Sequence, residues 1–121
     1  CEALIKPFGG RAVVDLIESD LAAPSFSYQT AEALAERFPE DQLRWIIGSD
    51  AAHELNRWKE IHRLEAAAPF LILGRQGAAS VSDQTPLSLP EVASRDLRNR
   101  LADGENLQGW IPESVLALLK T

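Results

Sequence analysis

The sequence has no methionine, a single cysteine and no long apolar run, and each of these absences narrows what the chain can be. Because residue 1 is Cys1, we expect that it is not an initiator, and residues 1–10 read as the end of a helix that stops at Gly9 and Gly10. Cys1 has no second cysteine to pair with, which favours a reducing compartment. We therefore expect a cytoplasmic chain that lacks a segment upstream.

Charge and hydropathy argue against two further classes of function, general nucleic-acid binding and membrane association. The chain has 18 acidic and 12 basic residues, which gives a net charge of −6. This charge argues against general binding of nucleic acid, which needs a basic face. We expect no membrane partner, since no apolar stretch could cross a bilayer and no signal-peptide pattern opens the chain. His53 and His62 lack structural-zinc spacing and read as solvated, so we expect no protein-bound metal.

Short apolar segments alternate with amphipathic ones along the 121 residues. Strands are expected at residues 12–15, 43–47, 70–73 and, weakened by two prolines, 85–90. Helices are expected at residues 28–38, 50–55, 58–67 and 95–102, and from Pro112 to the carboxyl end. This alternation predicts one α/β domain over residues 1–121, with a Rossmann-like, doubly wound parallel sheet.

The most informative stretch is residues 43–58, LRWIIGSDAAHELNRW. An apolar strand ends at Gly48 and leads into a helix, and ligands of open α/β sheets bind at the carboxyl ends of strands. Gly48 would let a ligand approach the backbone, Asp50 would accept hydrogen bonds from sugar hydroxyls, and Trp58 could fold over the same pocket. The alternative is that Gly48 forms a tight turn, Asp50 caps a helix and Trp58 belongs to the core.

Two further segments place polar groups at the start of a helix. Residues 25–30 read SFSYQT, with Ser27 as a candidate N-cap, and residues 92–98 read VASRDLR, with Ser94 in the same position. Free backbone N–H groups at such helix starts can bind anions. Taken singly, both serines could be ordinary caps and Arg98 an exposed surface charge.

In their order and spacing, these segments resemble the bacterial nicotinate-nucleotide adenylyltransferases of the HxGH nucleotidyltransferase superfamily. That family carries P-S-Y-T-x-x-T, I-I-G-x-D followed after eight residues by Trp, R-P-G, and I-S-S-T-x-I-R. The corresponding segments here are PSFSYQT (24–30), IIGSD (46–50) with Trp58, RQG (75–77) and VASRDLR (92–98), and the tail at 104–119 is also similar. The resemblance covers nearly the whole chain and makes it a carboxyl-terminal portion of the nucleotidyltransferase domain.

Two departures from the family pattern stand out. In the last motif Ala93 replaces a serine and Arg95 a threonine, which leaves the details of phosphate contact open. The family's G-x-F-x-P-x-H-x-G-H loop, whose histidines stabilise the triphosphate, is absent from these residues and is expected upstream of Cys1. We therefore assign no catalytic residue to this chain and expect it to be inactive alone, without a missing N-terminal segment or a partner chain that completes the sheet.

The resemblance implies adenylyl transfer from ATP, accompanied by Mg²⁺, to nicotinate mononucleotide, which gives deamido-NAD and pyrophosphate in NAD biosynthesis. Its nucleotide substrates would be the small-molecule partners of the chain. For nicotinate mononucleotide it points to Phe26, Ser27 and Trp58. For ATP it points to Gly48, Asp50, Arg75, Ser94 and Arg98.

Two other functions stay open at this stage. One is a nucleotide-binding or interaction module without catalysis, which the absence of the histidine loop favours. The other is a sister adenylyltransferase acting on another nucleotide or on phosphopantetheine, against which the aromatic Phe26 and Trp58 favour a pyridine ring. The sequence leaves open the preference between nicotinate and nicotinamide and the oligomeric state, a homo-oligomer included.

Overall fold

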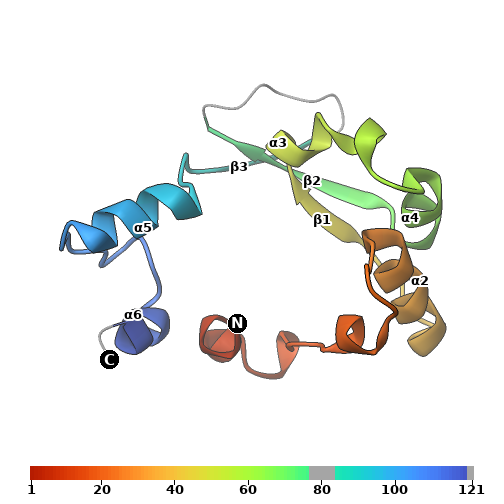
Figure 1. Cartoon of the computed structure of the whole chain (residues 1–121), viewed down its shortest axis with the longest axis horizontal. Helices are drawn as coiled ribbons and strands as arrows, with labels where there is room; N and C mark the ends of the chain where they lie inside the picture. The colour runs from red at the N-terminus through yellow and green to blue at the C-terminus, as the bar shows by residue number, and fades with distance from the viewer. Residues whose placement is uncertain (77–83, 120–121) are drawn as a thin grey trace. The chain divides into compact units, whose positions relative to one another are not determined.

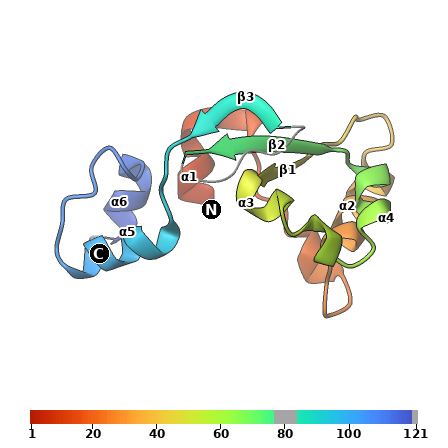
Figure 2. The same ribbon diagram turned by 90° about the horizontal axis from the view of Figure 1, so that it is seen from above.

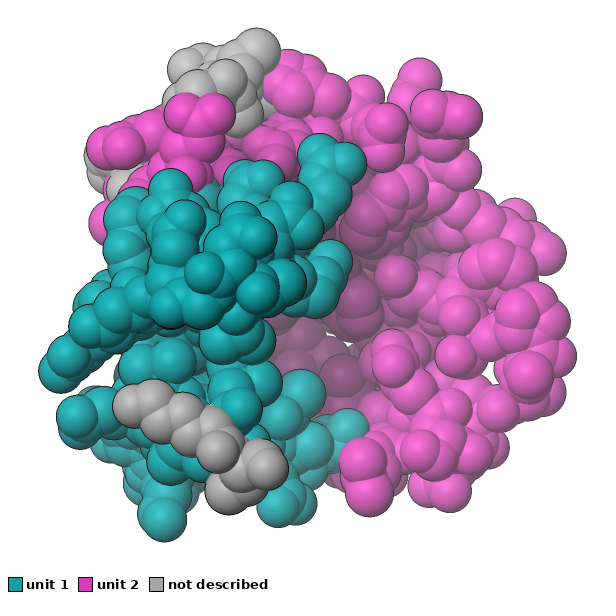
Figure 3. All heavy atoms as spheres, turned by 60° about the vertical axis from the view of Figure 1, so that its left-hand side comes forward, with its two compact units in different colours: residues 1–15, 92–121 teal, residues 16–91 magenta. Residues whose placement is uncertain are grey.

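A computed structural model describes residues 1–76 and 84–119, and it divides into two compact units (Figure 3). Unit 2 comprises Leu16–Glu91 and contains the sheet. Unit 1 combines Cys1–Asp15 with Val92–Thr121 and is helical. The single domain expected over residues 1–121 stays a prediction.

The sheet of unit 2 is parallel and has the strand order β1-β2-β3 (Figure 2). Its strands are β1 (Trp45–Gly48), β2 (Phe70–Arg75) and β3 (Gln84–Leu89). The apolar segments WIIG and FLIL pair in register, with Trp45 opposite Phe70 and Gly48 opposite Leu73. Near-continuous apolar runs of this kind are typical of parallel strands. The α/β class is confirmed, and so are the three strands expected between residues 43 and 90.

Two helices of unit 2 pack against each other beside the sheet, α2 (Ser27–Arg37) and α4 (Ile61–Ala67) (Figure 1). Between them Ala31, Leu64 and Ala68 are buried, and Leu64 is only 1% exposed. Ala31 has a small side chain, which allows the close approach. Phe38, the last residue of the helix expected at 28–38, is 41% exposed, because α2 ends one residue earlier, ahead of Pro39.

The segment between β1 and α4 is less helical than predicted. In place of one helix over 50–55 there is one turn of α-helix, α3 (Ser49–Ala52), followed by a 3-10 turn, η3 (Leu55–Arg57). The helix expected from residue 58 begins only at Ile61, because Glu60 adopts a left-handed conformation with φ 51°. Trp58 consequently lies on extended backbone and packs sideways onto the core of α2 and α4.

Unit 1 is built from short helices at both ends of the chain: α1 (Glu2–Ile5), the 3-10 segment η1 (Lys6–Arg11), α5 (Ser94–Ala102) and α6 (Glu113–Leu119). The hydroxyl of Ser114 donates a hydrogen bond of 2.7 Å to the carbonyl of Ala3, which ties α6 to α1. Leu107 and Leu116 are buried. Gly104, at φ 75°, follows α5 as its C′ glycine.

The prediction of a strand at residues 12–15 is wrong. These residues form no strand in the described chain, and Val13 is 76% exposed. Two β-branched residues in a row favour extended backbone, but a strand also needs a neighbour that accepts and donates its ladder hydrogen bonds. The short 3-10 segment η2 (Ile17–Asp20) follows, and Glu18 on it accepts a hydrogen bond of 3.0 Å from the buried Thr30 hydroxyl.

Candidate functional site

An ion pair joins the ends of two neighbouring strands in unit 2. Asp50 lies in the first turn of α3, directly after β1, and Arg75 is the last residue of β2. Nη1 of Arg75 and Oδ2 of Asp50 are 2.5 Å apart. Since parallel strands end at the same edge, this pair marks the carboxyl edge of the sheet, where ligands of such sheets bind.

Open space lies beside the backbone at Gly48, between β1 and Asp50. The backbone there is ordinary, with φ −78° and ψ 158°, and a Cβ built on Gly48 would meet no atom within 4 Å. Neither backbone strain nor packing within the described residues therefore requires a glycine. Beside it, Ser49 is buried, and its hydroxyl has no hydrogen-bond partner among the described residues.

Three residues expected to form one site do come together in unit 2. Phe26, Ser27 and Trp58 line a hollow of about 280 Å³, together with Arg57 and Lys59. We call it the aromatic hollow. Trp58 is half-buried: it packs against the core cluster and also lines the hollow. The pocket and the core, expected as alternatives for Trp58, are both in contact with it, and its part in a binding site stays a prediction. Gly48 is not among the described lining residues, so the expected closeness of the indole to that turn stays a prediction.

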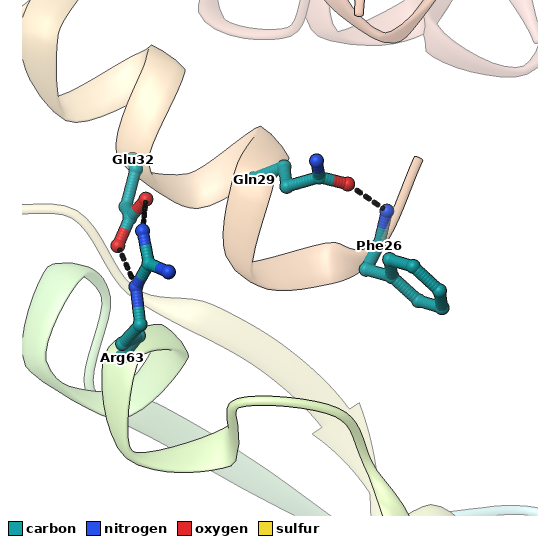
Figure 4. Close-up of polar contacts among 4 residues, drawn as sticks. All are labelled: Phe26, Gln29, Glu32 and Arg63. Carbon is teal, nitrogen blue, oxygen red and sulfur yellow. Dashed lines mark hydrogen bonds and ion pairs between the residues drawn. The ribbon is translucent and has the colours of Figure 1, made fainter. Parts of the chain in front are cut away.

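The start of α2 positions Phe26 in the lining of the aromatic hollow. Phe26 is the N-cap residue, and its backbone N–H donates a hydrogen bond of 2.7 Å to the side-chain oxygen of Gln29 (Figure 4). Its ring stacks on Tyr28, with centroids 6.3 Å apart and an interplanar angle of 12°. Ser27 is thus the first helical residue and not the N-cap that the sequence suggested.

Two cations, Lys59 and Arg63, lie close to these aromatic rings. Lys59 Nζ lies 4.6 Å from the centroid of Phe26, and the Arg63 guanidinium lies 4.6 Å from that of Tyr28. Arg63 also binds both carboxylate oxygens of Glu32, at 2.8 and 2.6 Å, and this hydrogen-bonded ion pair raises the pKa of Arg63 above its ordinary value (Figure 4). Arg57 has a weaker partner in Glu54, at 3.7 Å.

Arg57 and Lys59 are the lining residues that reasoning from the sequence missed. The signal available was their position on either side of Trp58, but adjacent residues on a helix point in different directions. Residue 58 was expected to begin a helix, whereas in the structure η3 ends at Arg57, Trp58 has extended backbone, and all three residues line one hollow.

Ser94 and Arg98 belong to unit 1 and are described within it. Ser94 is the first residue of α5, with Ala93 as the N-cap residue, so the predicted cap lies one position too far along the chain. Arg98 follows four residues later, on the same side of the helix. Both side chains are exposed, as a site for an anionic ligand at a helix start requires.

The described residues offer neither a metal-binding cluster nor a membrane-spanning helix. Over residues 1–76 and 84–119, no group of three or more His, Cys, Asp or Glu side chains could hold a metal ion. His53 and His62 are both exposed, as expected. No helix in the same part of the chain has the length and apolar character needed to span a bilayer.

Comparison with known proteins finds several relatives that carry the same name. No family model matches the chain. The chain is 36% identical over 102 residues to a protein of Anaeromyxobacter dehalogenans, covering 82% of this chain and 54% of that protein. It is 33% identical over 110 residues to a protein of Thermus thermophilus (87% and 59%), and 32% identical over 119 residues to one of Myxococcus xanthus (97% and 61%). All three are named probable nicotinate-nucleotide adenylyltransferases.

A solved structure supports the fold. It comes from Vibrio parahaemolyticus and is assigned to the nicotinate-nucleotide adenylyltransferases. It matches 98% of this chain and 63% of its own, with a TM-score of 0.67 and 21% identity. The chain therefore spans little more than half the length of the curated relatives it matches.

Proposed function

Since this chain is similar to nicotinate-nucleotide adenylyltransferases over a little more than half of their length, we propose that it is the carboxyl-terminal part of such an enzyme and supplies its substrate-binding portion. The reaction is adenylyl transfer from ATP to nicotinate mononucleotide, which yields deamido-NAD and pyrophosphate. The observation that carries the proposal is the aromatic hollow, because residues 26–27 and 58, far apart in sequence, meet there around a space that a flat ring can enter.

In the proposed reaction, catalysis rests mainly on binding and orienting the substrates. A phosphate oxygen of nicotinate mononucleotide attacks the α-phosphorus of ATP, a new P–O bond forms, and the bond to the bridging oxygen breaks as pyrophosphate leaves. Mg²⁺ enters with ATP as part of that substrate. No protein nucleophile is required, so this chain contributes by holding the reacting groups in line and by offsetting their charge.

The mononucleotide is assigned to the aromatic hollow. Trp58 presents flat apolar surface to its pyridine ring, and stacking of this kind is worth about 0.5–1.5 kcal/mol beyond the area buried; Phe26 lines the hollow beside it. Ser27 adds a hydroxyl, and the first N–H groups of α2 have no partner within the helix. A ring that carries an anionic substituent suits such a position.

In unit 2, the ribose of ATP is assigned to the strand edge. Asp50 accepts hydrogen bonds from ribose hydroxyls, and Arg75 orients its carboxylate through their ion pair. The open space at Gly48 lets the nucleotide approach the backbone. In unit 1, Ser94 and Arg98 contribute a hydroxyl and a guanidinium to the phosphates.

The free edge of β1 supports a further part of the proposal. Among the described strands β1 pairs only with β2, and Ile46 on it is 61% exposed. An apolar edge strand of this kind invites pairing with another strand. We propose that a strand from outside these residues pairs with β1 and brings the catalytic loop, and that residues 1–121 alone do not turn over.

The test compares two preparations, the complete gene product and residues 1–121 alone. Each is assayed for pyrophosphate release with ATP and nicotinate mononucleotide. Turnover is expected only from the complete product. Nucleotide binding without turnover by both would favour a binding module instead. Turnover by monodisperse residues 1–121 would show that no further strand is needed.

A further inference from the structure

One charge at the aromatic hollow has no counter-ion among the described residues. Five described residues line this hollow, and none of them is acidic. Two are cationic, and of these Arg57 has a carboxylate partner, Glu54, at 3.7 Å. Lys59 has none among the described residues: its ammonium lies over the Phe26 ring, 4.6 Å from the centroid. Within the described residues, the hollow therefore combines flat apolar surface with one positive charge that has no carboxylate partner.

This combination matches a particular ligand chemistry. An exposed ammonium over an aromatic face is held weakly, and a carboxylate brought beside it forms a stronger, charge-assisted hydrogen bond. A flat ring that stacks on Trp58 would share the hollow with Lys59, the next residue in the chain, whose ammonium is then available to a substituent of that ring. The ligand that fits is a heteroaromatic acid, and the matching amide would leave the ammonium without a counter-ion.

We infer that Lys59 determines specificity, and that its ammonium selects a pyridine ring with a carboxylate over the same ring with a carboxamide. This inference rests on the proposed function, and it names the group by which the site would tell nicotinate mononucleotide from nicotinamide mononucleotide. The neighbouring Arg63 is a poorer candidate. Its guanidinium is bound by both oxygens of Glu32, and it is not among the described residues that line the hollow.

The Lys59 ammonium is assigned to the ring substituent and not to the 5′-phosphate. The two assignments make different predictions. Both mononucleotides carry the phosphate, so a lysine that binds it would help both equally. Only the nicotinate form carries a second anion. Selectivity between the two substrates therefore reports on the ring substituent alone.

The experiment measures kcat/KM for nicotinate and nicotinamide mononucleotides with the complete gene product and its Lys59→Gln variant. We expect Lys59→Gln to lower the ratio of the two kcat/KM values, acid over amide, by about tenfold, which corresponds to about 1.4 kcal/mol. Lys59→Arg should keep most of the preference, because it keeps the charge. Arg63→Gln removes a neighbouring charge that is not among the described lining residues and should leave the ratio unchanged, since Arg63 is bound by both carboxylate oxygens of Glu32.

Two results would overturn the inference and leave the proposed function standing. One is an equal loss of kcat/KM for both mononucleotides in Lys59→Gln, which would point to the phosphate or to a folding defect. The other is an unchanged ratio. A wild-type gene product that uses neither mononucleotide would instead refute the proposed function.

Discussion

Asp50 and Arg75 are 25 residues apart in sequence, yet their side chains form an ion pair with 2.5 Å between Oδ2 and Nη1. The register of the sheet brings them together: Gly48 lies opposite Leu73, so the segments after both residues leave the same edge. The Asp50 side chain is 49% exposed, and ion pairs this accessible add little to stability. The pair is therefore better explained by the orientation it gives the carboxylate than by its effect on folding.

This relationship predicts a non-additive pair of substitutions. Asp50→Asn should lower kcat/KM for ATP by about tenfold or more, because a hydrogen bond to a charged acceptor is worth about 1.5–3 kcal/mol. Arg75→Gln should cost less, because it only loosens the carboxylate. The double variant should then be no worse than Asp50→Asn alone. Steady-state kinetics on the four proteins would check this, and losses that multiply would mean that Arg75 contacts ATP itself.

Gly48→Ala should separate stability from activity. A methyl group at this position meets no protein atom within 4 Å and the backbone is unstrained, so the free energy of unfolding should stay the same or rise by up to about 1 kcal/mol. If a nucleotide occupies the space, the KM for ATP should rise by at least about fivefold through overpacking. Thermal melts and kinetics measure the two effects.

Gly10→Ala is the matched control for Gly48→Ala. Its Cβ would also meet nothing within 4 Å, and it lies outside the proposed site. It should leave the KM for ATP unchanged. A fall in stability with unchanged KM in Gly48→Ala would show that the glycine serves the fold and not a ligand.

Trp58→Ala should affect both the mononucleotide and the fold, because the indole lines the hollow and also packs on the core. We expect KM for nicotinate mononucleotide to rise by about tenfold or more. The free energy of unfolding should fall by about 1–3 kcal/mol, less than the ~3–5 kcal/mol typical of a fully buried tryptophan. Trp58→Phe should recover part of both.

Trp110→Ala serves as a control for the loss of an indole. Trp110 is 50% exposed and lies in unit 1 against Arg100. It should leave the KM for the mononucleotide unchanged. A rise in KM equal to that of Trp58→Ala would remove the case for stacking by Trp58.

Arg98→Ala should weaken the use of ATP by about tenfold and change the KM for the mononucleotide little. The reason is that Arg98 extends one helical turn beyond the exposed start of α5, where phosphate oxygens would be bound. Arg100→Ala is the control, because Arg100 is engaged by Glu105 at 3.5 Å and by Trp110. Equal effects of Arg98→Ala on both substrates would contradict the assignment.

Much of unit 2 could be predicted from sequence because its signals are local. The apolar runs WIIG and FLIL, each followed by a glycine or polar residues, identify β1 and β2, and the i, i+3, i+4 spacing from Ala31 identifies α2. The failures also have a local origin. Val13 and Val14 favour extended backbone, yet the described chain forms no strand there. Trp58 suits a helix, but the left-handed Glu60 separates it from α4.

The sequence by itself determined which chemical groups are available and in what order, because order and composition are covalent: Phe26 and Ser27 before a helix, Gly48 and Asp50 after a strand, Ser94 and Arg98 at another helix start. Only the tertiary structure decided which of them meet. The pairing of Asp50 with Arg75 depends on sheet register, and the position of Lys59 over Phe26 depends on a backbone turn between two elements. Contacts of this kind follow from packing between distant segments, which no local pattern in the chain records.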